Sequence, residues 1–271
     1  MYETSYVRPR SLAEAVNLLQ ENPEAKPLSG GMTLIPTMKQ RLAAPSHVID
    51  LTRLSDLKGI SLNDGVLRIG AATVHADVAS SDVVAENIPA LSILAGLIAD
   101  PQVRNRGTMG GSVANNDPSA DYPSAVLGLN ATVITSERRI AADDFFVGMF
   151  ETALQPGEVI VAIEFPCPDQ AGYAKCRHPA SGYAVTGVFV ARFGADVRVA
   201  VTGAGTSVFR WSDAEARLAQ TCSVEVLRDL HIDAEELLED TYAPRPYRAN
   251  LVEVYTRRAV AAMLARPEPA K

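Results

Sequence analysis

The chain has 271 residues, of which 47% are hydrophobic and 21% charged, so it can bury a core in one large or two ordinary domains. Its 32 acidic and 25 basic residues leave a net charge of −7, which argues against a protein that holds nucleic acid through a surplus of Lys and Arg. No apolar run approaches the roughly 20 residues that span a bilayer. Because residues 1–9 also lack the pattern of a secretion signal, we expect a cytoplasmic protein.

The cysteines and histidines offer no recognisable metal site. The three cysteines are odd in number and lack CxxC spacing, which excludes a disulfide framework and a four-thiolate iron–sulfur site in this chain. The four histidines have no ligand-like pairing, so we expect surface or capping positions for them. Redox chemistry would therefore need an organic cofactor. The residues are Cys167, Cys176, Cys222, His47, His75, His178 and His231.

Residues 1–55 are predicted to form a small β-α-β unit. Ser11 and Glu14 have the spacing of a capping box, and apolar residues at helical spacing follow them. A second helix can include Pro36 because this residue falls in its first turn. The glycine pair Gly30-Gly31 lies where the first strand turns into that helix. The expected strands are 25–28 and 47–51, and the expected second helix is 33–41.

Residues 56–170 have a different texture. Asn63-Asp64-Gly65 between two apolar runs predicts a hairpin, and Pro89 predicts the start of a helix. The polar, glycine-rich stretch 100–121 is expected to be a loop, and 166–172 a linker. The expected strands are 60–62, 66–71, 131–135 and 158–165, and the expected helices are 74–79 and 90–99.

Residues 171–271 are predicted to form a third unit, in which strands precede helices. Ser212 and Glu215 have the spacing of a second capping box. The expected elements are strands at 184–193 and 197–202 and a last helix over 247–264. The chain is thus predicted to be an α+β protein of three units.

Two glycine pairs are the candidate binding elements. A Gly-Gly pair between an apolar strand and a helix allows successive backbone N–H groups to converge on a phosphate, where side chains would block the approach. Two such pairs could clamp both halves of a pyrophosphate, although either pair alone could serve only to make a tight turn. Neither pair has the spacing of a dinucleotide-binding Rossmann loop or of a P-loop. The two segments are Leu28, Ser29, Gly30, Gly31, Met32 and Thr33, and Gly107, Thr108, Met109, Gly110, Gly111 and Ser112.

A run of small and polar residues, including Asn115, follows the second pair. Asp117 precedes Pro118, which favours a helix cap. Asp121 has two interpretations: its carboxylate could accept hydrogen bonds from the hydroxyls of a sugar alcohol, or it could be a solvated acid in the first turn of a helix.

These motifs resemble a known family. The chain reads Ser-Gly-Gly-Met-Thr-Leu-Ile-Pro at 29–36, Asp-Pro-Gln-Val-Arg-Asn-Arg-Gly-Thr-Met-Gly-Gly at 100–111 and Asp-Pro-Ser-Ala-Asp at 117–121. In these motifs and over nearly its whole length it resembles the FAD-binding medium subunit of molybdenum hydroxylases, which include aerobic carbon monoxide dehydrogenase and bacterial xanthine dehydrogenase.

The resemblance implies both a fold and a role. The fold would be a two-part FAD-binding domain of the vanillyl-alcohol-oxidase (PCMH) type, divided at 1–55 and 56–170, followed by a smaller α+β domain at 171–271. The chain would be an oxidoreductase subunit that binds FAD. It would receive electrons from the 2Fe-2S clusters of a small partner subunit and pass them to an external acceptor. A large partner subunit would carry the molybdenum cofactor, in a dimer of heterotrimers.

The resemblance also implies which residues bind FAD. The segments 28–33 and 108–112 would hold the pyrophosphate, and Asp121 would bind the ribityl chain. Ala99 and Val103 would lie near the adenine, and Lys175 and Tyr183 near the flavin ring. No residue of this chain would be catalytic. The implied cofactor residues are Leu28, Ser29, Gly30, Gly31, Met32, Thr33, Ala99, Val103, Thr108, Met109, Gly110, Gly111, Ser112, Asn115, Asp121, Lys175 and Tyr183.

One departure and two alternatives stay open at this point. Many relatives have Asp where this chain has Gly182, which leaves open what becomes of any role of that acid, such as steering an electron acceptor. The chain could instead be a stand-alone FAD-dependent oxidoreductase, which would need its own proton-handling residues, or a scaffold subunit without flavin. The sequence names neither the substrate of a complex (carbon monoxide, a purine, an aldehyde or an N-heterocycle) nor the electron acceptor.

Overall fold

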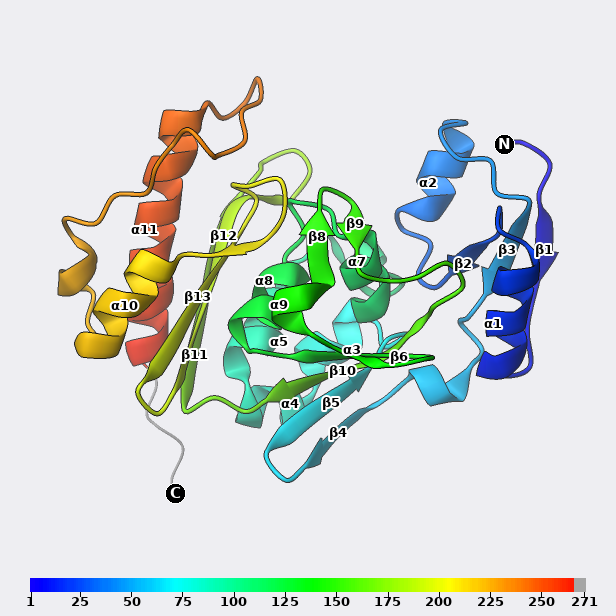
Figure 1. Cartoon of the computed structure of the whole chain (residues 1–271), viewed down its shortest axis with the longest axis horizontal. Coiled ribbons are helices and arrows are strands. Elements are labelled where there is room, and N and C mark those ends of the chain that lie inside the picture. The colour runs from blue at the N-terminus through cyan, green and yellow to red at the C-terminus, as the bar shows by residue number, and fades with distance from the viewer. Residues whose placement is uncertain (266–271) are drawn as a thin grey trace.

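The computed structural model describes residues 1–265. The predicted third unit therefore includes residues, 266–271, that lie outside the described part. Figure 1 shows an elongated molecule, with the N-terminal unit at one end and the helix α11 (Arg245–Leu264) at the other. Within residues 1–265 the strands form a three-stranded, a five-stranded and a four-stranded sheet, together with a two-stranded ribbon.

The N-terminal sheet is parallel, with the order β1-β3-β2. Parallel neighbours need crossover connections, which the two helices supply. Ser11 begins the first helix as predicted, because its Oγ accepts a hydrogen bond from the Glu14 N–H at 3.2 Å. The β-α-β prediction is confirmed, and the structure adds a first strand to it. The elements are β1 (Ser5–Val7), α1 (Leu12–Glu21), β2 (Lys26–Leu28), α2 (Leu34–Lys39) and β3 (His47–Asp50).

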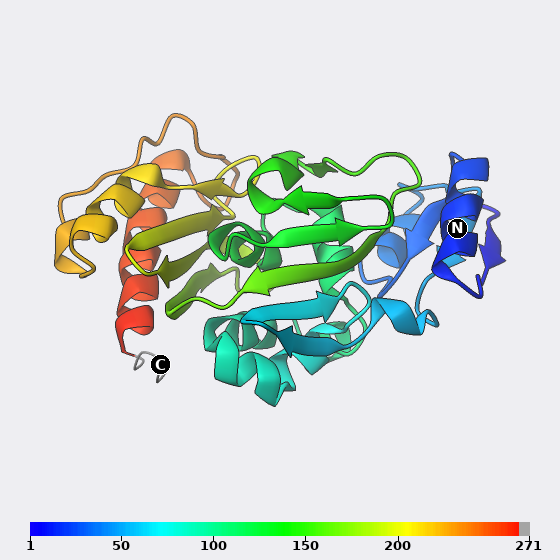
Figure 2. The same ribbon diagram turned by 60° about the horizontal axis from the view of Figure 1, so that its bottom comes forward.

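The central sheet is antiparallel, with the order β4-β5-β10-β6-β7. The predicted hairpin is confirmed: Asp64 and Gly65 have φ of 49° and 73°, the positive values that a tight two-residue hairpin turn requires. Figure 2 shows this sheet in the middle of the molecule. Its strands are β4 (Ile60–Asn63), β5 (Val66–Gly70), β6 (Thr132–Thr135), β7 (Arg139–Ala141) and β10 (Ile160–Pro166), and η1 (Ser55–Leu57) precedes them.

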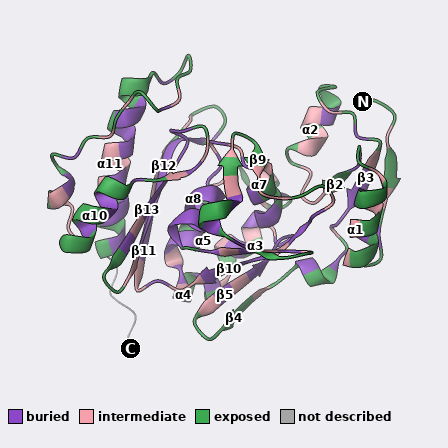
Figure 3. Cartoon of the chain, in the orientation of Figure 1, coloured by how far each residue is buried: buried purple, intermediate pink, exposed green. Residues whose placement is uncertain are grey.

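Short helices share one apolar core with this sheet, in which Ile69 and Ile163 of the strands meet Leu94 and Val126 of the helices. Figure 3 shows this buried interior. The two-stranded ribbon follows the last of the helices. The helices are α3 (His75–Ser80), α4 (Asp82–Asn87), α5 (Pro89–Gly96), α6 (Pro101–Arg104), α7 (Met109–Asn115), α8 (Tyr122–Gly128) and α9 (Ala142–Phe145), and the ribbon is β8 (Phe146–Gly148) and β9 (Glu151–Thr152).

The prediction of a loop over 100–121 is wrong, because this stretch contains α6 and α7. Asp100 caps the first of them, accepting a hydrogen bond from the Val103 N–H at 2.8 Å. Thr108 caps the second, accepting one from the Gly111 N–H at 3.2 Å. The composition of this segment is typical of a loop, and its two helices are stabilised by these polar caps and not by the helix propensity of their residues.

The C-terminal sheet β11-β12-β13-β14 is antiparallel. The predicted linker is wrong from Gln170 onward, because β11 begins there. The second capping box is also wrong: Ser212 lies inside α10, and the Glu215 side chain instead accepts hydrogen bonds from the Val199 N–H and from Arg210. The elements are β11 (Gln170–Arg177), β12 (Ala184–Phe193), β13 (Asp196–Thr202), β14 (Phe209–Arg210), α10 (Ser212–Gln220) and η2 (Glu225–Leu227), and α11 confirms the predicted last helix.

Both faces of this sheet are covered. Tyr173 and Phe189 belong to the same apolar core as α5 and α8, whereas Val190 and Val199 pack against Trp211 and the last helix. One core therefore runs across the predicted boundary near residue 170. The division into 1–55, 56–170 and 171–271 stays a prediction.

We expect the substitution Gly172→Val to destabilise the protein. A Cβ on Gly172 would lie 2.1 Å from the carbonyl oxygen of Ala259, a backbone atom of α11 that cannot move aside cheaply. The free energy of unfolding should fall by about 1–3 kcal/mol, the usual cost of overpacking a core. Thermal or urea unfolding measures it. Ser61→Val, at an exposed strand position, is the control and should be close to neutral; equal stability of the two variants would contradict the close approach of β11 and α11.

Candidate functional site

A cavity of about 860 Å³ lies between the N-terminal unit and the rest of the molecule. This volume falls within the range of cofactor pockets, roughly 300–1,000 Å³. Its walls come from distant parts of the chain: the β2–α2 turn, the start of α7, the segment around Ala99, and the loops 152–160 and 177–183. The cavity is therefore a product of the tertiary fold.

The two glycine segments meet in this cavity. The hydroxyls of Ser29 and Thr108 are joined by a hydrogen bond of 2.9 Å. A Cβ on Gly30 would lie 2.2 Å from the carbonyl oxygen of Arg106 and 2.6 Å from the Cα of Gly107, so only glycine allows the two backbones to approach this closely. Gly31 has a φ of 72°, in the left-handed region that favours glycine.

The backbone donors of the two segments are used differently. Within residues 1–265, the N–H groups of residues 29–33 have no hydrogen-bond acceptor. In the second segment, the N–H groups of Met109 and Gly110 donate to Thr73 and Ala71, and that of Gly111 to its own cap. The first segment thus presents free donors to the cavity, whereas the second chiefly builds its wall. Such a cradle of N–H groups fits a pyrophosphate without any cation.

Asp121 lies at the floor of the cavity in a buried network. Its carboxylate accepts hydrogen bonds from the Tyr173 hydroxyl at 2.5 Å and from Lys175 Nζ at 2.8 Å. The Asp121 and Lys175 side chains are only 4% and 2% exposed. Burial raises the pKa of Asp121, and the attraction of Lys175 opposes this shift. The interpretation of Asp121 as a solvated acid is therefore wrong.

Asp117 also differs from its predicted role. Its carboxylate accepts a hydrogen bond from the Ser119 N–H at 2.9 Å and closes a turn, whereas the next helix begins only at Tyr122. Asp117 is therefore no helix cap. Burial raises its pKa, and the Ser119 N–H opposes the shift. A second carboxylate thus lines the cavity close to Tyr183.

The loop 177–183 closes one end of the cavity. Gly182 donates its N–H to the carbonyl of His178, and Lys175 donates to the carbonyl of Gly182 at 3.1 Å. Arg177 reaches across and donates to the carbonyl of Ala99 at 3.1 Å. A Cβ on Gly182 would lie 3.5 Å from the Cα of Ala99, so Ala99 lies beside the residue that precedes Tyr183. The resemblance assigns Ala99 to the adenine and Tyr183 to the flavin ring, and both assignments stay predictions.

The structure gathers nearly all of the predicted cofactor residues around this cavity. Met109 is the first exception: it is fully buried in the apolar core. Lys175 is the second, because its ammonium group is turned to Asp121 and to the loop above it. The predicted residues that line the cavity are Leu28, Ser29, Gly30, Gly31, Met32, Thr33, Ala99, Val103, Thr108, Gly110, Gly111, Ser112, Asn115, Asp121 and Tyr183. Their individual roles stay predictions.

Sequence reasoning missed several lining residues. His75 was expected at the surface or as a cap, yet it is 4% exposed and lines the cavity. Glu158 also lines it, from a loop that carries no motif. A histidine directly after an apolar run is too common a pattern to have identified the first, and nothing in the sequence marks the second.

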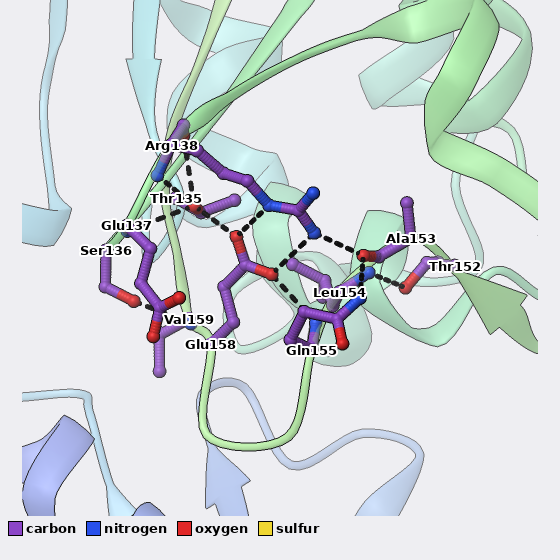
Figure 4. Close-up of polar contacts among 10 residues, drawn as sticks. All are labelled: Thr135, Ser136, Glu137, Arg138, Thr152, Ala153, Leu154, Gln155, Glu158 and Val159. Atoms are coloured by element: carbon purple, nitrogen blue, oxygen red, sulfur yellow. Dashed lines mark hydrogen bonds and ion pairs between the residues drawn. The ribbon is translucent and has the colours of Figure 1, made fainter.

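Glu158 is the centre of a network of polar contacts in the cavity wall, as Figure 4 shows. Its side chain, 0% exposed, accepts hydrogen bonds from Arg138 at 3.0 and 3.1 Å, from the Thr135 hydroxyl at 2.6 Å and from the Gln155 N–H at 2.8 Å. Burial alone would raise the pKa of Glu158, but these donors outweigh it, and the pKa lies below its ordinary value. The network ties the β6–β7 turn to the loop before β10.

Two other classes of site find no support in residues 1–265. No three His, Cys, Asp or Glu side chains in this part of the chain are grouped so that they could hold a metal ion. The helices of the same residues include none with the length and apolar character needed to cross a bilayer.

Comparisons with known proteins agree with the geometry. Residues 2–168 match the family model described as the FAD binding domain in molybdopterin dehydrogenase. The chain is 35% identical to the carbon monoxide dehydrogenase medium chain of Hydrogenophaga pseudoflava, covering 96% of this chain and 97% of that one. It is 33% identical to the nicotine 6-hydroxylase medium subunit of Paenarthrobacter nicotinovorans, covering 94% and 95%.

Solved structures give the same answer. The chain superposes on a chain of reconstituted CO dehydrogenase from Oligotropha carboxidovorans with a TM-score of 0.89 and 32% identity, covering 97% and 98% of the two chains. For quinoline 2-oxidoreductase from Pseudomonas putida 86, the TM-score is 0.88 at 28% identity, again over 97% and 98%. The fold is thus an FAD-binding fold of the PCMH type. The chain belongs to the family of FAD-binding subunits of molybdenum hydroxylases, and it is an oxidoreductase subunit with FAD as its cofactor.

We expect Glu158→Gln to lower stability at neutral pH and to remove part of its acid dependence. Because the folded pKa of Glu158 is depressed, its contribution is present above the unfolded value and is lost as the pH falls through the folded one. The melting temperature should fall by about 2–4 °C at pH 7, and the difference should shrink below about pH 4. Glu164→Gln, which disrupts ion pairs with Arg68 and Arg139, is the control and should have the smaller effect. Parallel pH profiles for wild type and Glu158→Gln would refute this role.

Proposed function

We propose that this chain is the electron-transfer flavoprotein of a molybdenum hydroxylase. It would receive electrons from 2Fe-2S clusters of a small partner subunit and deliver them to an external acceptor. The observation that carries the proposal is the cavity, where the free backbone donors of 29–33 stand next to Thr108. Bound FAD supplies the ability to take up and release electrons, which no side chain of this chain has to provide.

The role of the protein residues is then to bind and to orient. The N–H groups of 29–33 would hold the pyrophosphate, and Ser29 and Thr108 would fix the distance between the two walls. Asp121, held in place by Tyr173 and Lys175, would accept hydrogen bonds from the ribityl hydroxyls. Tyr183, 41% exposed, would cover one face of the flavin ring system and leave the other face accessible to the electron acceptor.

The substrate of the complex would be determined by another subunit. The chain has nearly equal identity, 33–35%, to medium chains whose names refer to carbon monoxide, glyceraldehyde and nicotine. If residues of this subunit selected one of these compounds, the chain should be more similar to one of these relatives than to the others. We therefore propose a large partner subunit with a molybdenum cofactor, in a cytoplasmic dimer of heterotrimers, and a division of this chain at residues 55 and 170.

We expect Gly111→Val to abolish retention of FAD while leaving the chain folded. A Cβ on Gly111 would lie 2.9 Å from Thr108 Oγ1 and 3.9 Å from the Cβ of Ser29, so the valine would fill the gap between the two segments. The affinity should fall by roughly 100-fold or more, since several hydrogen bonds to a charged group are lost. Flavin absorbance and equilibrium titration measure it.

Gly96→Val is the matched control. Gly96 is also a helical glycine, but its Cβ would meet only Ala79 at 3.9 Å, away from the cavity. This variant should retain FAD. Full retention by Gly111→Val would overturn the pyrophosphate site, and so would equal losses in both variants.

The electron route has its own test, in the intact complex purified with Gly111→Val. After addition of substrate, the iron–sulfur signals should appear as in the wild type, whereas reduction of the external acceptor should be lost. Rapid-freeze electron paramagnetic resonance follows the first step and acceptor absorbance the second. Acceptor reduction at the wild-type rate without flavin would rule out this route.

A further inference from the structure

His75 occupies a place that no motif explains. Its backbone N–H donates to the carbonyl of Gly107 at 2.9 Å, and its ring lies 5.3 Å from that of Tyr122. A Cβ on Gly107 would lie 2.6 Å from His75 Nε2. A Cβ on Gly30 would in turn meet Gly107. Gly107 is therefore packed closely against both Gly30 and the imidazole of His75.

The two ring nitrogens of His75 have different surroundings. Nδ1 is buried, and no residue within 1–265 forms a hydrogen bond with it. Nε2 is on the edge that packs against Gly107, and the residue lines the cavity. Because an orphaned buried N–H costs more than an unused lone pair, the proton belongs on Nε2. Burial, helped by the charge of Arg104, lowers the pKa of His75 to about 4, so the ring is neutral near pH 7.

A neutral imidazole in this place has a donor and no partner for it. No hydrogen bond within residues 1–265 involves Nε2, and Nε2, unlike Nδ1, is not fully buried, so it is free to donate to a ligand in the cavity. The other free donors at the junction are backbone N–H groups, all of which suit an anionic oxygen. A phosphate oxygen of a ligand would supply the acceptor that both Nε2–H and these backbone N–H groups lack.

We propose that His75 is an FAD-binding residue, whose Nε2–H donates a hydrogen bond to a pyrophosphate oxygen at the junction of the two glycine segments. This inference rests on the proposed cofactor site. It assigns to His75 a contact with the ligand beyond the packing of its ring against Tyr122. It also explains Gly107, since any side chain there would displace the imidazole.

The test compares His75→Leu, which keeps much of the volume without the donor, with His75→Gln, which keeps an N–H donor. FAD affinity of the purified full chain should fall about 10- to 100-fold for His75→Leu and by no more than about threefold for His75→Gln. The melting temperatures of the two apoproteins should agree within a few degrees. His47→Leu, at a histidine outside the cavity, is the control and should bind FAD as the wild type does.

Phosphorus NMR of the bound cofactor gives a readout that packing alone would not move. At saturating FAD, one pyrophosphate resonance should shift in His75→Leu and return in His75→Gln. Unchanged resonances and unchanged affinity in His75→Leu would overturn the proposal, as would equal losses in both variants. Failure of the wild type itself to bind FAD would instead overturn the proposed cofactor site, so the two failures are distinguishable.

Discussion

The cavity depends on one close contact between backbones. Gly30 approaches Arg106 and Gly107 at a distance that no Cβ could occupy, and the hydroxyls of Ser29 and Thr108 bond across the same junction. The two segments are 79 residues apart in the sequence, yet their separation determines the width of the site. If the junction opened, the free donors of 29–33 would lose the wall that faces them. The glycines are thus needed for approach as much as for flexibility.

Around that junction the two glycine segments differ in what their backbone N–H groups do: one set bonds within the fold, and the other is free to bind a ligand. The N–H groups of Met109, Gly110 and Gly111 are consumed by the fold, whereas those of 29–33 are not. Similar sequence motifs therefore have different physical roles. The free backbone donors lie on a three-stranded unit with a small apolar cluster that also includes Ala72 and Val159, whereas the second segment begins a helix, α7, that packs into the larger core.

Much of this arrangement could be predicted from the sequence, and the failures have physical reasons. The capping residue Ser11, the turn at Asp64-Gly65 and the long last helix depend on local rules, and they are confirmed. The helices within 100–121 were missed because their caps, not their propensity, determine them. The burial of Asp121 and His75 could not be predicted because burial is a property of the tertiary fold. The network of Glu158 joins residues twenty or more positions apart, and no local pattern signals it.

The cavity also lies where the N-terminal unit meets the rest of the chain. The N-terminal unit contributes one wall and the rest of the chain the other, so a molecule that fills the space is held by both at once. By mass action, such a bridging ligand stabilises the closed arrangement in proportion to the logarithm of its free concentration over its dissociation constant. The supply of cofactor thereby enters the stability of the polypeptide, because a chain that has bound FAD costs more free energy to unfold than one that has not.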